Sequence, residues 1–238
     1  MVAPRADTMP DESGGKYLGD AVYGALDGIV TTFAVVAGVA GAGRSSGVIL
    51  ILGFANLLGD GVSMAAGNYL GKRSERAYRE QRRTQERADI EHDPAAHREH
   101  LAGIYRKKGF SGAQLTGIVA TLTRDKERWT DEMMVGELGI FQEDISPWRS
   151  AFATLGAFIL AGLVPLLSYL VAIRFPQVAQ YSLVAAFLLT GVALFTVGGM
   201  RSLLTSTRWW RAGAEMLVVG GFAAGVAYAV GWLLSGLA

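Results

Sequence analysis

The stretch VILILGFANLLGDGVSMAAGNYLGKRSERAYREQRRTQERADIEH, residues 48–92, decides the class of this fold. Its first half, 48–71, is apolar except for Asp60 and exceeds the roughly 20 residues that a helix needs to cross a bilayer. Its second half is densely charged, consists mainly of strong helix formers, and contains no Gly or Pro after Gly71. The sequence therefore predicts one unbroken helix of about 45 residues that leaves the membrane and projects into water.

Four further apolar segments accompany this helix. The whole chain has 238 residues, of which only 18% are charged, whereas soluble domains carry about 25%. The segments are 21–43, interrupted only by Asp27; 151–173 and 177–200, which contain no charged residue; and 213–237. We therefore predict an all-α integral membrane protein with five transmembrane helices. The absence of cysteine excludes disulfides and Cys-ligated zinc or iron–sulfur sites.

The distribution of Lys and Arg predicts the orientation in the membrane. Fifteen of them lie in the polar insert 72–149, two in the N-terminal tail and three in the loop 201–212, against two on the other side. Because positive loops stay in the cytoplasm, we expect a cytoplasmic N-terminus and a C-terminus on the opposite side. The expected parts are a disordered tail at 1–15, spans one and two at 16–71, a cytosolic helical insert at 72–149, and spans three to five at 150–238.

The insert 72–149 reads as three short helices packed on the long one. Asp93-Pro94 predicts a second helix, because Asp is a good N-cap and Pro a good first helical residue. That helix should end at 107–108, with Gly109 as its left-handed cap. Ser111 could cap a third helix through about 123, and a fourth is expected near 126–138, ended by Gly139.

Two spans carry carboxylates that are costly in a membrane, by about 3 kcal/mol or more each. Asn56, Asp60 and Met64 are spaced i, i+4, i+8, so they share one stripe of span two. Asp20 and Asp27 share a face of span one in the same way. One alternative is that these polar side chains are structural and only pair with a neighbouring group. Two such faces turned toward each other would instead make a polar path through the bilayer, and its oxygen ligands and single sulfur suit a divalent transition-metal ion. The motif Gly24-x-x-x-Gly28 predicts close helix packing.

The insert offers a second set of metal ligands. All three histidines lie within nine residues, and three helices each present a pair of donors at helical spacing, a pattern typical of metal sites. The pairs are Glu86 with Asp89, His97 with His100, and Met133 with Glu137. A solvated charged face is the alternative for the acidic residues, and the clustered histidines favour ligands. The ligands alone leave Fe(II), Mn(II), Co(II), Ni(II) and Zn(II) open.

The basic residues of the insert do not indicate nucleic acid. Its arginines alternate with glutamates, so no basic stripe for phosphates is formed, and we expect no nucleic-acid partner. The lipid bilayer is the expected partner instead, with anionic headgroups next to Lys72, Arg73 and Arg76.

Three motifs resemble the vacuolar iron transporter family. They are DGIVTTFAVVAGVAGAG at 27–43, GFANLLGDGVSMAAGNYLGKRSE at 53–75 and WTDEMMVGELG at 129–139. The resemblance covers about residues 16–238. It implies a homodimeric exporter that moves Fe(II), and often Mn(II), out of the cytosol in exchange for protons, along a path between the subunits. The metal would be cargo, so we expect no cofactor and no enzyme activity.

The resemblance also assigns residues. Asp27 and Met64 match the family's metal ligands in the spans, and Glu86, Met133 and Glu137 match ligands in the insert. Four positions depart from the plant-like pattern. Asp89 stands where a second glutamate is usual, His97 and His100 replace glutamates, and Asn56 replaces a glutamate that serves metal or proton transfer. Asp60, one turn from Asn56, could take over that proton role.

Two other functions compete with transport. A membrane-anchored ferroxidase would use the insert as a di-metal site, but Glu-x-x-Asp and His-x-x-His differ from the Glu-x-x-His pairs of ferritin-like sites. A metal sensor or storage protein would leave the carboxylates inside the spans without a role. The membrane would be the plasma membrane in a bacterium and the vacuolar membrane in a eukaryote.

Overall fold

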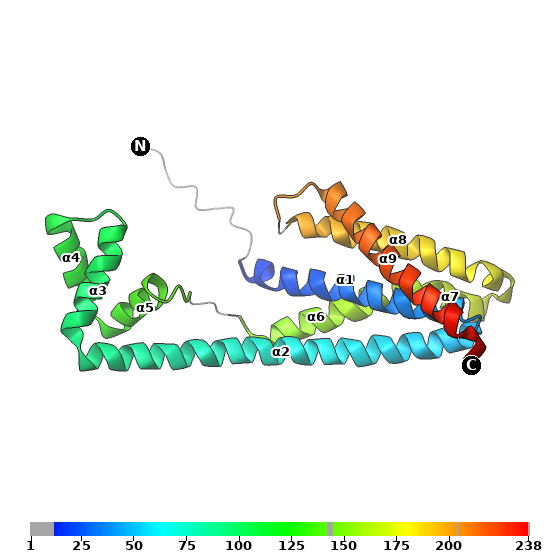
Figure 1. The fold of residues 1–238 in the computed structure, drawn as a ribbon, viewed down its shortest axis with the longest axis horizontal. Helices are drawn as coiled ribbons and strands as arrows, with labels where there is room; N and C mark the ends of the chain where they lie inside the picture. The colour runs from blue at the N-terminus through cyan, green and yellow to red at the C-terminus, as the bar shows by residue number, and fades with distance from the viewer. Residues whose placement is uncertain (1–11, 142–144, 204, 238) are drawn as a thin grey trace. The chain divides into compact units, whose positions relative to one another are not determined.

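The computed structural model describes residues 12–141, 145–203 and 205–237, and these residues form helices and connections without a strand (Figure 1). The α-helices are α1 (Glu12–Gly41), α2 (Ser46–His92), α3 (Pro94–Lys107), α4 (Gly112–Leu122), α5 (Lys126–Gly136), α6 (Pro147–Gly162), α7 (Val164–Arg174), α8 (Ser182–Met200) and α9 (Trp209–Leu234). Short 3-10 helices are η1 (Pro176–Tyr181), η2 (Arg201–Leu203) and η3 (Ser235–Leu237). The chain divides into two compact units, Met1–Leu70 with Ile145–Ala238, and Gly71–Asp144.

Helix α2 confirms the main prediction from the sequence. It runs without a break from Ser46 to His92, so the apolar segment and the charged segment form one 47-residue helix. Its residues up to Leu70 belong to the first unit, and those from Gly71 belong to the second. The first helix begins at Glu12, inside the segment predicted as a tail, and residues 1–11 lie outside the described part.

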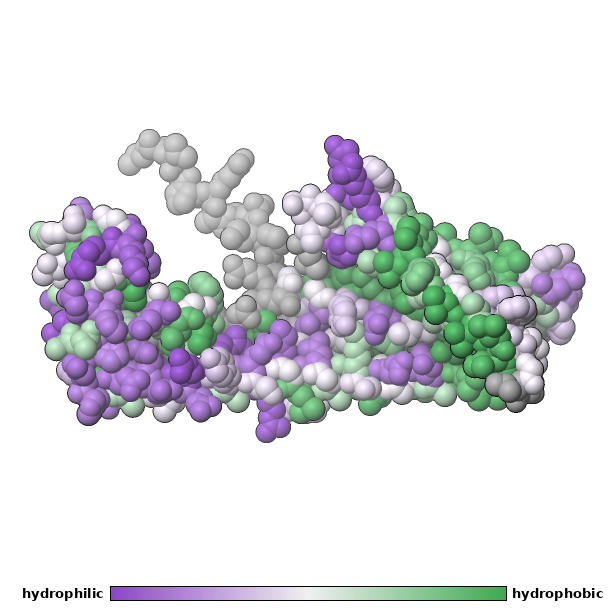
Figure 2. Space-filling model, viewed as in Figure 1, coloured by the Kyte–Doolittle hydropathy of each residue, from purple (hydrophilic) through white to green (hydrophobic). Residues whose placement is uncertain are grey.

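The first unit contains the apolar helices α1, α6, α7, α8 and α9 and the apolar half of α2. Four of its helices are long and apolar enough to cross a membrane, and the bent pair α6–α7 makes a fifth if it counts as one span. A buried cluster around Leu57, Phe158 and Leu166 joins α2, α6 and α7. The outward-facing side chains of these helices are largely apolar, as Figure 2 shows for one face, which is the surface expected of helices in lipid.

The third predicted span is broken, which corrects the expectation of one continuous helix over 151–173. Helices α6 and α7 meet at Leu163 and are bent by 48°. Pro165 lies in the first turn of α7, and proline cannot donate the backbone hydrogen bond that a straight helix would need there. The break is thus a local consequence of one residue inside an uncharged run.

Helix α1 lies very close to α6, as the Gly24-x-x-x-Gly28 motif predicts. A Cβ placed on Gly24 would lie 2.5 Å from the carbonyl oxygen of Thr154, and one on Gly28 would lie 3.0 Å from the Cα of Phe158. Gly162 faces the backbone of Gly28 from the other side. Only residues without a side chain allow two backbones to approach this closely, so these glycines hold α1, which carries Asp27, directly against α6.

The second unit contains the charged half of α2 with α3, α4 and α5, as predicted. The Asp93 side chain accepts a hydrogen bond from the backbone N–H of Ala96, and Pro94 starts α3. Gly109 and Gly139 have positive φ angles of 97° and 65°, which glycine adopts without strain. Ser111 occupies the N-cap position of α4, but its side chain makes no capping hydrogen bond.

A small apolar core holds the second unit together. It consists of Ile90 from α2, Leu101 and Ala102 from α3, Val119 from α4, and Trp129 and Met133 from α5. On the face of this unit drawn in Figure 2, hydrophilic residues predominate. The core therefore fixes three short helices to one another and to α2, which positions the histidines and carboxylates on their surfaces.

Candidate metal sites

The two carboxylates predicted inside the spans lie near each other. Asp27 on α1 is half-buried, and Asp60 on α2 is the charged group that acts on it electrostatically. The backbone carbonyl of Asp27 accepts a hydrogen bond of 2.9 Å from the Thr31 hydroxyl. Two carboxylates of like charge repel each other, and a cation bound between them removes that repulsion. The pair can therefore attract a metal ion or a proton.

Asn56 and Met64 flank this pair along α2 without contacting it through a hydrogen bond in the described residues. The Nδ2 atom of Asn56 is buried and has no hydrogen-bond partner there. Met64 is half-buried and packs against the cluster that contains Leu57 and Phe158. The three residues of the predicted stripe therefore differ in exposure. Asp60 lies on the exposed surface of the chain, whereas Asn56 and Met64 turn partly inward.

In the second unit, Glu86 and His97 face each other. Glu86 is 8% exposed, and its Oε1 atom lies 3.8 Å from His97 Nε2, without a hydrogen-bond partner among the described residues. His97 Nδ1 lies 2.9 Å from the carbonyl oxygen of Asp93. A carbonyl only accepts, so Nδ1 carries a proton, and in the neutral imidazole Nε2 is then the nitrogen with the free lone pair. This tautomer is the one that a histidine uses to bind a metal through Nε2.

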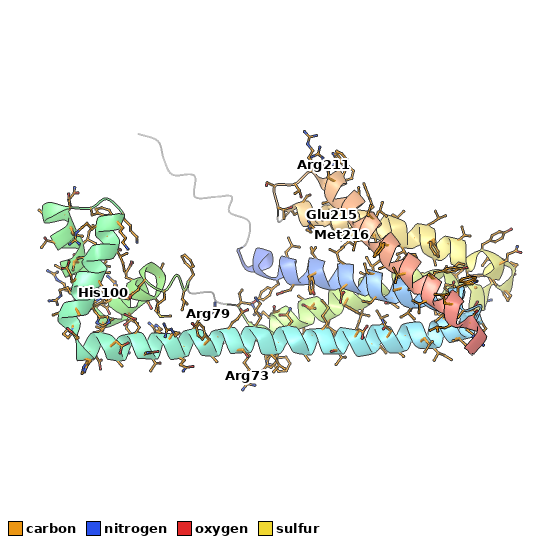
Figure 3. All side chains as sticks on the ribbon, in the orientation of Figure 1. Arg73, Arg79, His100, Arg211, Glu215 and Met216 are labelled. Carbon is orange, nitrogen blue, oxygen red and sulfur yellow. The ribbon has the colours of Figure 1, made fainter. Side chains whose placement is uncertain are left out.

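A second pair lies beside the first. His100 Nδ1 is 3.8 Å from Glu137 Oε2, and the rings of His97 and His100 are 5.9 Å apart. Glu137 and Asp89 both act on Glu86 as nearby negative charges. Figure 3 shows His100 on the insert. Five of the six predicted insert ligands therefore lie on neighbouring surfaces of α2, α3 and the end of α5.

This arrangement does not form a closed metal site in the structure. Donor atoms that share one metal at about 2.1 Å sit roughly 3–3.5 Å apart, and both His–Glu pairs are slightly wider. Within the described ranges, no three His, Asp or Glu side chains are close enough together to hold one ion. The ligand roles of the insert remain predictions from the sequence.

Met133, the sixth predicted insert ligand, lies in the apolar core. Its side chain is fully buried, in a cluster with Leu101 and Trp129. The thioether therefore packs as a core residue in this structure, which is the common role of methionine. Its predicted role as a ligand is untested.

Ion pairs position α5 along the charged half of α2. Arg83 Nη2 lies 2.7 Å from Glu127 Oε2 and 3.0 Å from Asp131 Oδ1, and Arg87 also pairs with Glu127. Lys126 Nζ lies 3.1 Å from Glu91 Oε1. Each exposed pair contributes at most about 1 kcal/mol, but together they fix the register of the two helices. That register also determines the position of Glu137, at the end of α5, relative to Glu86 on α2.

A hydrogen bond also joins α3 to α5. Tyr105 Oη donates to Glu132 Oε2 over 2.9 Å. Burial, together with this hydrogen bond, raises the pKa of Tyr105 to about 12, so the phenol remains a donor at neutral pH.

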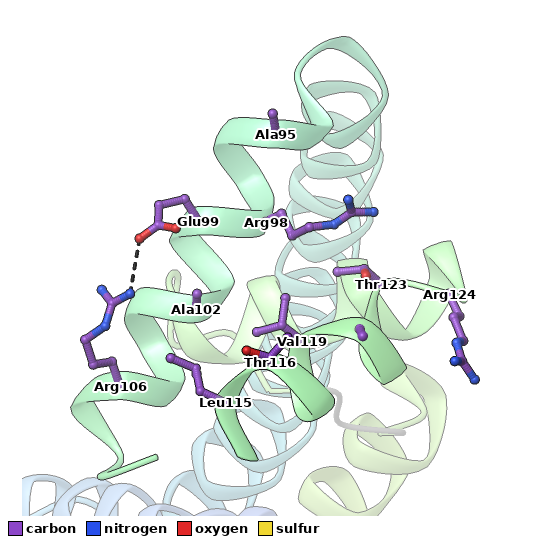
Figure 4. Close-up of a pocket in the computed structure, with 11 residues that line it drawn as sticks. Ala95, Arg98, Glu99, Ala102, Arg106, Leu115, Thr116, Val119, Thr123 and Arg124 are labelled. Atoms are coloured by element: carbon purple, nitrogen blue, oxygen red, sulfur yellow. Dashed lines mark hydrogen bonds and ion pairs between the residues drawn. The ribbon is translucent and has the colours of Figure 1, made fainter. Parts of the chain in front are cut away.

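A cavity of about 670 Å³ between α3 and α4 has a different chemistry (Figure 4). Arg106 in its wall is 3.2 Å from Glu99, and Arg98 lies over the ring of Trp129. The floor includes Leu115 and Val119. Because its charged lining is mainly basic and contains no histidine, this cavity is not a candidate metal site.

The first unit also contains a polar cluster that was not predicted from the sequence. Asp20 on α1 accepts hydrogen bonds from Asn68 on α2 and from Ser150 on α6, and Asn68 also donates to Thr154 on α6. One signal could have revealed it. Asn68 follows Met64 by one further i, i+4 step, so it lies on the same side of α2 as Met64.

The comparisons with known proteins identify the family. A family model described as the VIT family matches residues 18–232. The chain belongs to the VIT family.

Curated relatives of this VIT family member carry transporter names. Vacuolar iron transporter of Toxoplasma gondii is 32% identical over 224 residues, which is 92% of this chain and 74% of the relative. Vacuolar iron transporter 1 of Arabidopsis thaliana is 29% identical over 234 residues, 95% of this chain and 92% of the relative. The protein of the same name from Eucalyptus grandis is 30% identical over 215 residues, 90% and 85% respectively.

Family membership and the apolar helices lead to the same conclusion about where the protein resides. Together they show that this VIT family member is an integral, multi-pass membrane protein. The family supports metal transport as its function, and its relatives are named as transporters rather than as enzymes.

Proposed function

We propose that this protein exports Fe²⁺, and also Mn²⁺, from the cytosol across a membrane in exchange for protons. The relatives named above are iron transporters by name, and their alignments span most of this chain. The metal is cargo in this proposal, and no resident cofactor or enzymatic step is required. The insert faces the cytosol and captures metal with Glu86, Asp89, His97, His100, Met133 and Glu137.

The observation that carries the proposal is the carboxylate pair in the apolar helices. Asp60 is exposed on a stretch of α2 whose other exposed residues, such as Leu58 and Val62, are mostly apolar. A carboxylate facing lipid costs about 3 kcal/mol or more. A structural polar group would be hydrogen-bonded, whereas Asp60 makes no hydrogen bond or ion pair in the described residues and has Asp27 as its nearby charge. A cation-carrying role explains both the position and the pairing.

The exposure of Asp60 also supports a homodimer. A second copy covering this face of α2 would remove Asp60 from lipid and place two sets of carboxylates around one axis. Gly59 and Gly67 on the same helix have open space around them, so another helix can approach closely there. We propose that the metal path follows this interface, with Asn56 and Met64 as further ligands.

The family does not favour the ferroxidase or the sensor as the primary function. Both alternatives leave the carboxylates of α1 and α2 without a role. The cytoplasmic N-terminus and the opposite location of the C-terminus are part of the same proposal, and they rest on the uneven distribution of Lys and Arg.

The experiment is metal uptake by proteoliposomes loaded with a metal-sensitive dye. We expect the intact chain to carry Fe²⁺ and Mn²⁺ and the Asp60→Asn variant to lose at least tenfold in rate. Glu215→Gln is the matched control, because Glu215 is an exposed carboxylate of the same unit that pairs with Arg201 at 3.1 Å. Equal rates for Asp60→Asn and the intact chain would contradict the proposed path, and no uptake by the intact chain would contradict transport itself.

A further inference from the structure

A closed network of polar side chains joins three helices of the first unit. Asp20 on α1 receives hydrogen bonds at both carboxylate oxygens, from Asn68 Nδ2 to Oδ1 at 3.2 Å and from Ser150 Oγ to Oδ2. Asn68 Nδ2 also donates to Thr154 Oγ1 at 2.7 Å, and Ser150 Oγ lies 3.1 Å from Asn68 Oδ1. Ser150 and Thr154 are completely buried. Buried polar groups in a membrane need partners, and this network supplies them.

Thr154 fixes the orientation of the Asn68 amide. Its hydroxyl donates to the backbone carbonyl of Ser150 over 3.1 Å, so its one proton is used there. Thr154 Oγ1 must therefore accept from Asn68, which means that the NH₂ group of Asn68 faces Thr154 and Asp20. The amide oxygen then faces Ser150.

Ser150 has one hydroxyl proton and two acceptors within reach, Asp20 Oδ2 and Asn68 Oδ1. When Asp20 is ionised, the Ser150 hydroxyl donates to Oδ2. When a proton binds at Oδ2, the new O–H of Asp20 can donate to Ser150 Oγ, and the Ser150 hydroxyl can turn to Asn68 Oδ1. One proton is added at Oδ2 and no heavy atom moves. The network is hydrogen-bonded in both states.

We propose that this network makes Asp20 a proton-holding residue, with Ser150 as the hydroxyl that switches between two acceptors and Asn68 and Thr154 as its positioning residues. Asn68 lies about two turns beyond Asp60 on α2, so the network is attached to the helix that also carries the proposed path. The proposal rests on the proposed function only for its link to transport.

The immediate environment of Asp20 is the hydrogen-bond network, and the ionisable groups of the same unit lie outside that network. The described ionisable side chains of the first unit lie on its helices and on the connections at their ends: Tyr17, Tyr23 and Asp27 on α1, Arg44 after it, Asp60 and Tyr69 on α2, Arg149 on α6, Tyr169 and Arg174 on α7, Tyr181 before α8, Arg201 after α8, Arg208 before α9, and Arg211, Glu215 and Tyr228 on α9. Several have other partners. Tyr17 accepts from the backbone of Ser146, and Arg201 pairs with Glu215. In the described part of the chain, the hydrogen bonds of Asp20 come from Asn68 and Ser150.

The test is an infrared pH titration of the full-length protein in lipid, which follows the C=O band of protonated carboxyls. Among the bands of the other carboxyls, we expect one titrating band that disappears in Asp20→Asn, and that band is assigned to Asp20. In Ser150→Ala, the band should titrate at a pH higher by roughly half to one unit, because a hydrogen bond to an ionised carboxylate is stronger than one to its protonated form. Asn68→Asp should raise the midpoint by about one unit or more, because it places a second carboxylate beside the first.

Ser182→Ala is the matched control. Ser182 is also a buried serine in this unit, but its hydroxyl has no hydrogen-bond partner in the described residues. In this variant, we expect the Asp20 band to titrate as it does in the intact chain. If no band is lost in Asp20→Asn, or if the midpoint is unchanged in both Ser150→Ala and Asn68→Asp, the proposal is overturned.

Transport gives the second readout. The pH profile of metal uptake should move in Ser150→Ala in the same direction as the infrared midpoint, with the KM for metal unchanged. A purely structural role of Ser150 would lower the rate at every pH without moving the profile, and that outcome would contradict the proton role. If the intact chain carries no metal, the proposed function fails, and the infrared result alone still decides the inference.

Discussion

The close approach of α1 to α6 makes Gly24→Ala a sensitive test of the packing. A Cβ at this position would lie 2.5 Å from the Thr154 carbonyl oxygen and 3.1 Å from its Cα. Ordinary contacts begin near 3.4 Å, so the helices would have to separate by about 0.9 Å. The obstructing atoms belong to the backbone and cannot rotate away. Overpacking of this kind costs about 1–3 kcal/mol.

The matched control is Gly156→Ala on α6. A Cβ on Gly156 meets nothing within 4 Å, so this variant gains only the helix propensity of alanine, about 1 kcal/mol. Gly24→Ala gains the same propensity, and the difference between the two variants therefore isolates the clash. This difference corresponds to an unfolding midpoint lower by roughly 2–12 °C in Gly24→Ala.

The assay is thermal unfolding in detergent, followed by circular dichroism at one scan rate, because unfolding of membrane proteins is commonly irreversible. Equal midpoints for Gly24→Ala and Gly156→Ala would refute the reasoning, since they would mean that α1 and α6 are not in backbone contact at this position.

Three further predictions concern the second unit. Asp93→Ala removes the cap of α3 and should lower the stability of this unit by about 1 kcal/mol, seen as faster amide exchange in α3 but not in α8. Arg83→Met keeps the length of the side chain but removes two ion pairs to α5, so protease cleavage between α4 and α5 should become several-fold faster, and an unchanged rate would contradict this. Glu86→Gln should weaken Mn²⁺ binding to the full chain at least tenfold by calorimetry, whereas Glu99→Gln, which lies outside the cluster, should bind as the intact chain does.

The sequence predicted the helices of the second unit well because their signals are local. The absence of Gly and Pro from 72 to 92 left nothing to interrupt α2, and Asp93 with Pro94 marked the start of α3. The glycines at 109 and 139 marked the ends of helices, and both have the expected positive φ. Each of these features depends on a few neighbouring residues.

The sequence contains a signal for the break between α6 and α7. Pro165 stands inside an uncharged run, and hydropathy alone reads that run as continuous because proline is neither charged nor strongly polar. Its effect is on backbone hydrogen bonding, which a count of apolar residues does not register. A proline-sensitive reading would have placed a bend there.

The candidate sites were predictable only in part. Helical spacing placed His97 and His100 on one face, and the structure brings each of them to a glutamate from another helix. The spacing could not show that Met133 is enclosed by the core, nor that Asp20 is held by Ser150 from a helix 130 residues away in sequence. Contacts between distant segments follow from tertiary packing and have no local signal.

The most direct test of the central claim is a simultaneous record of Fe²⁺ uptake and proton movement in proteoliposomes with an imposed pH gradient, comparing the intact chain with Asp27→Ala. We predict gradient-dependent uptake accompanied by proton flow in the opposite direction, and the loss of both in the variant with the helical content unchanged. Uptake that persists in Asp27→Ala, or uptake by the intact chain without proton flow, would contradict the account.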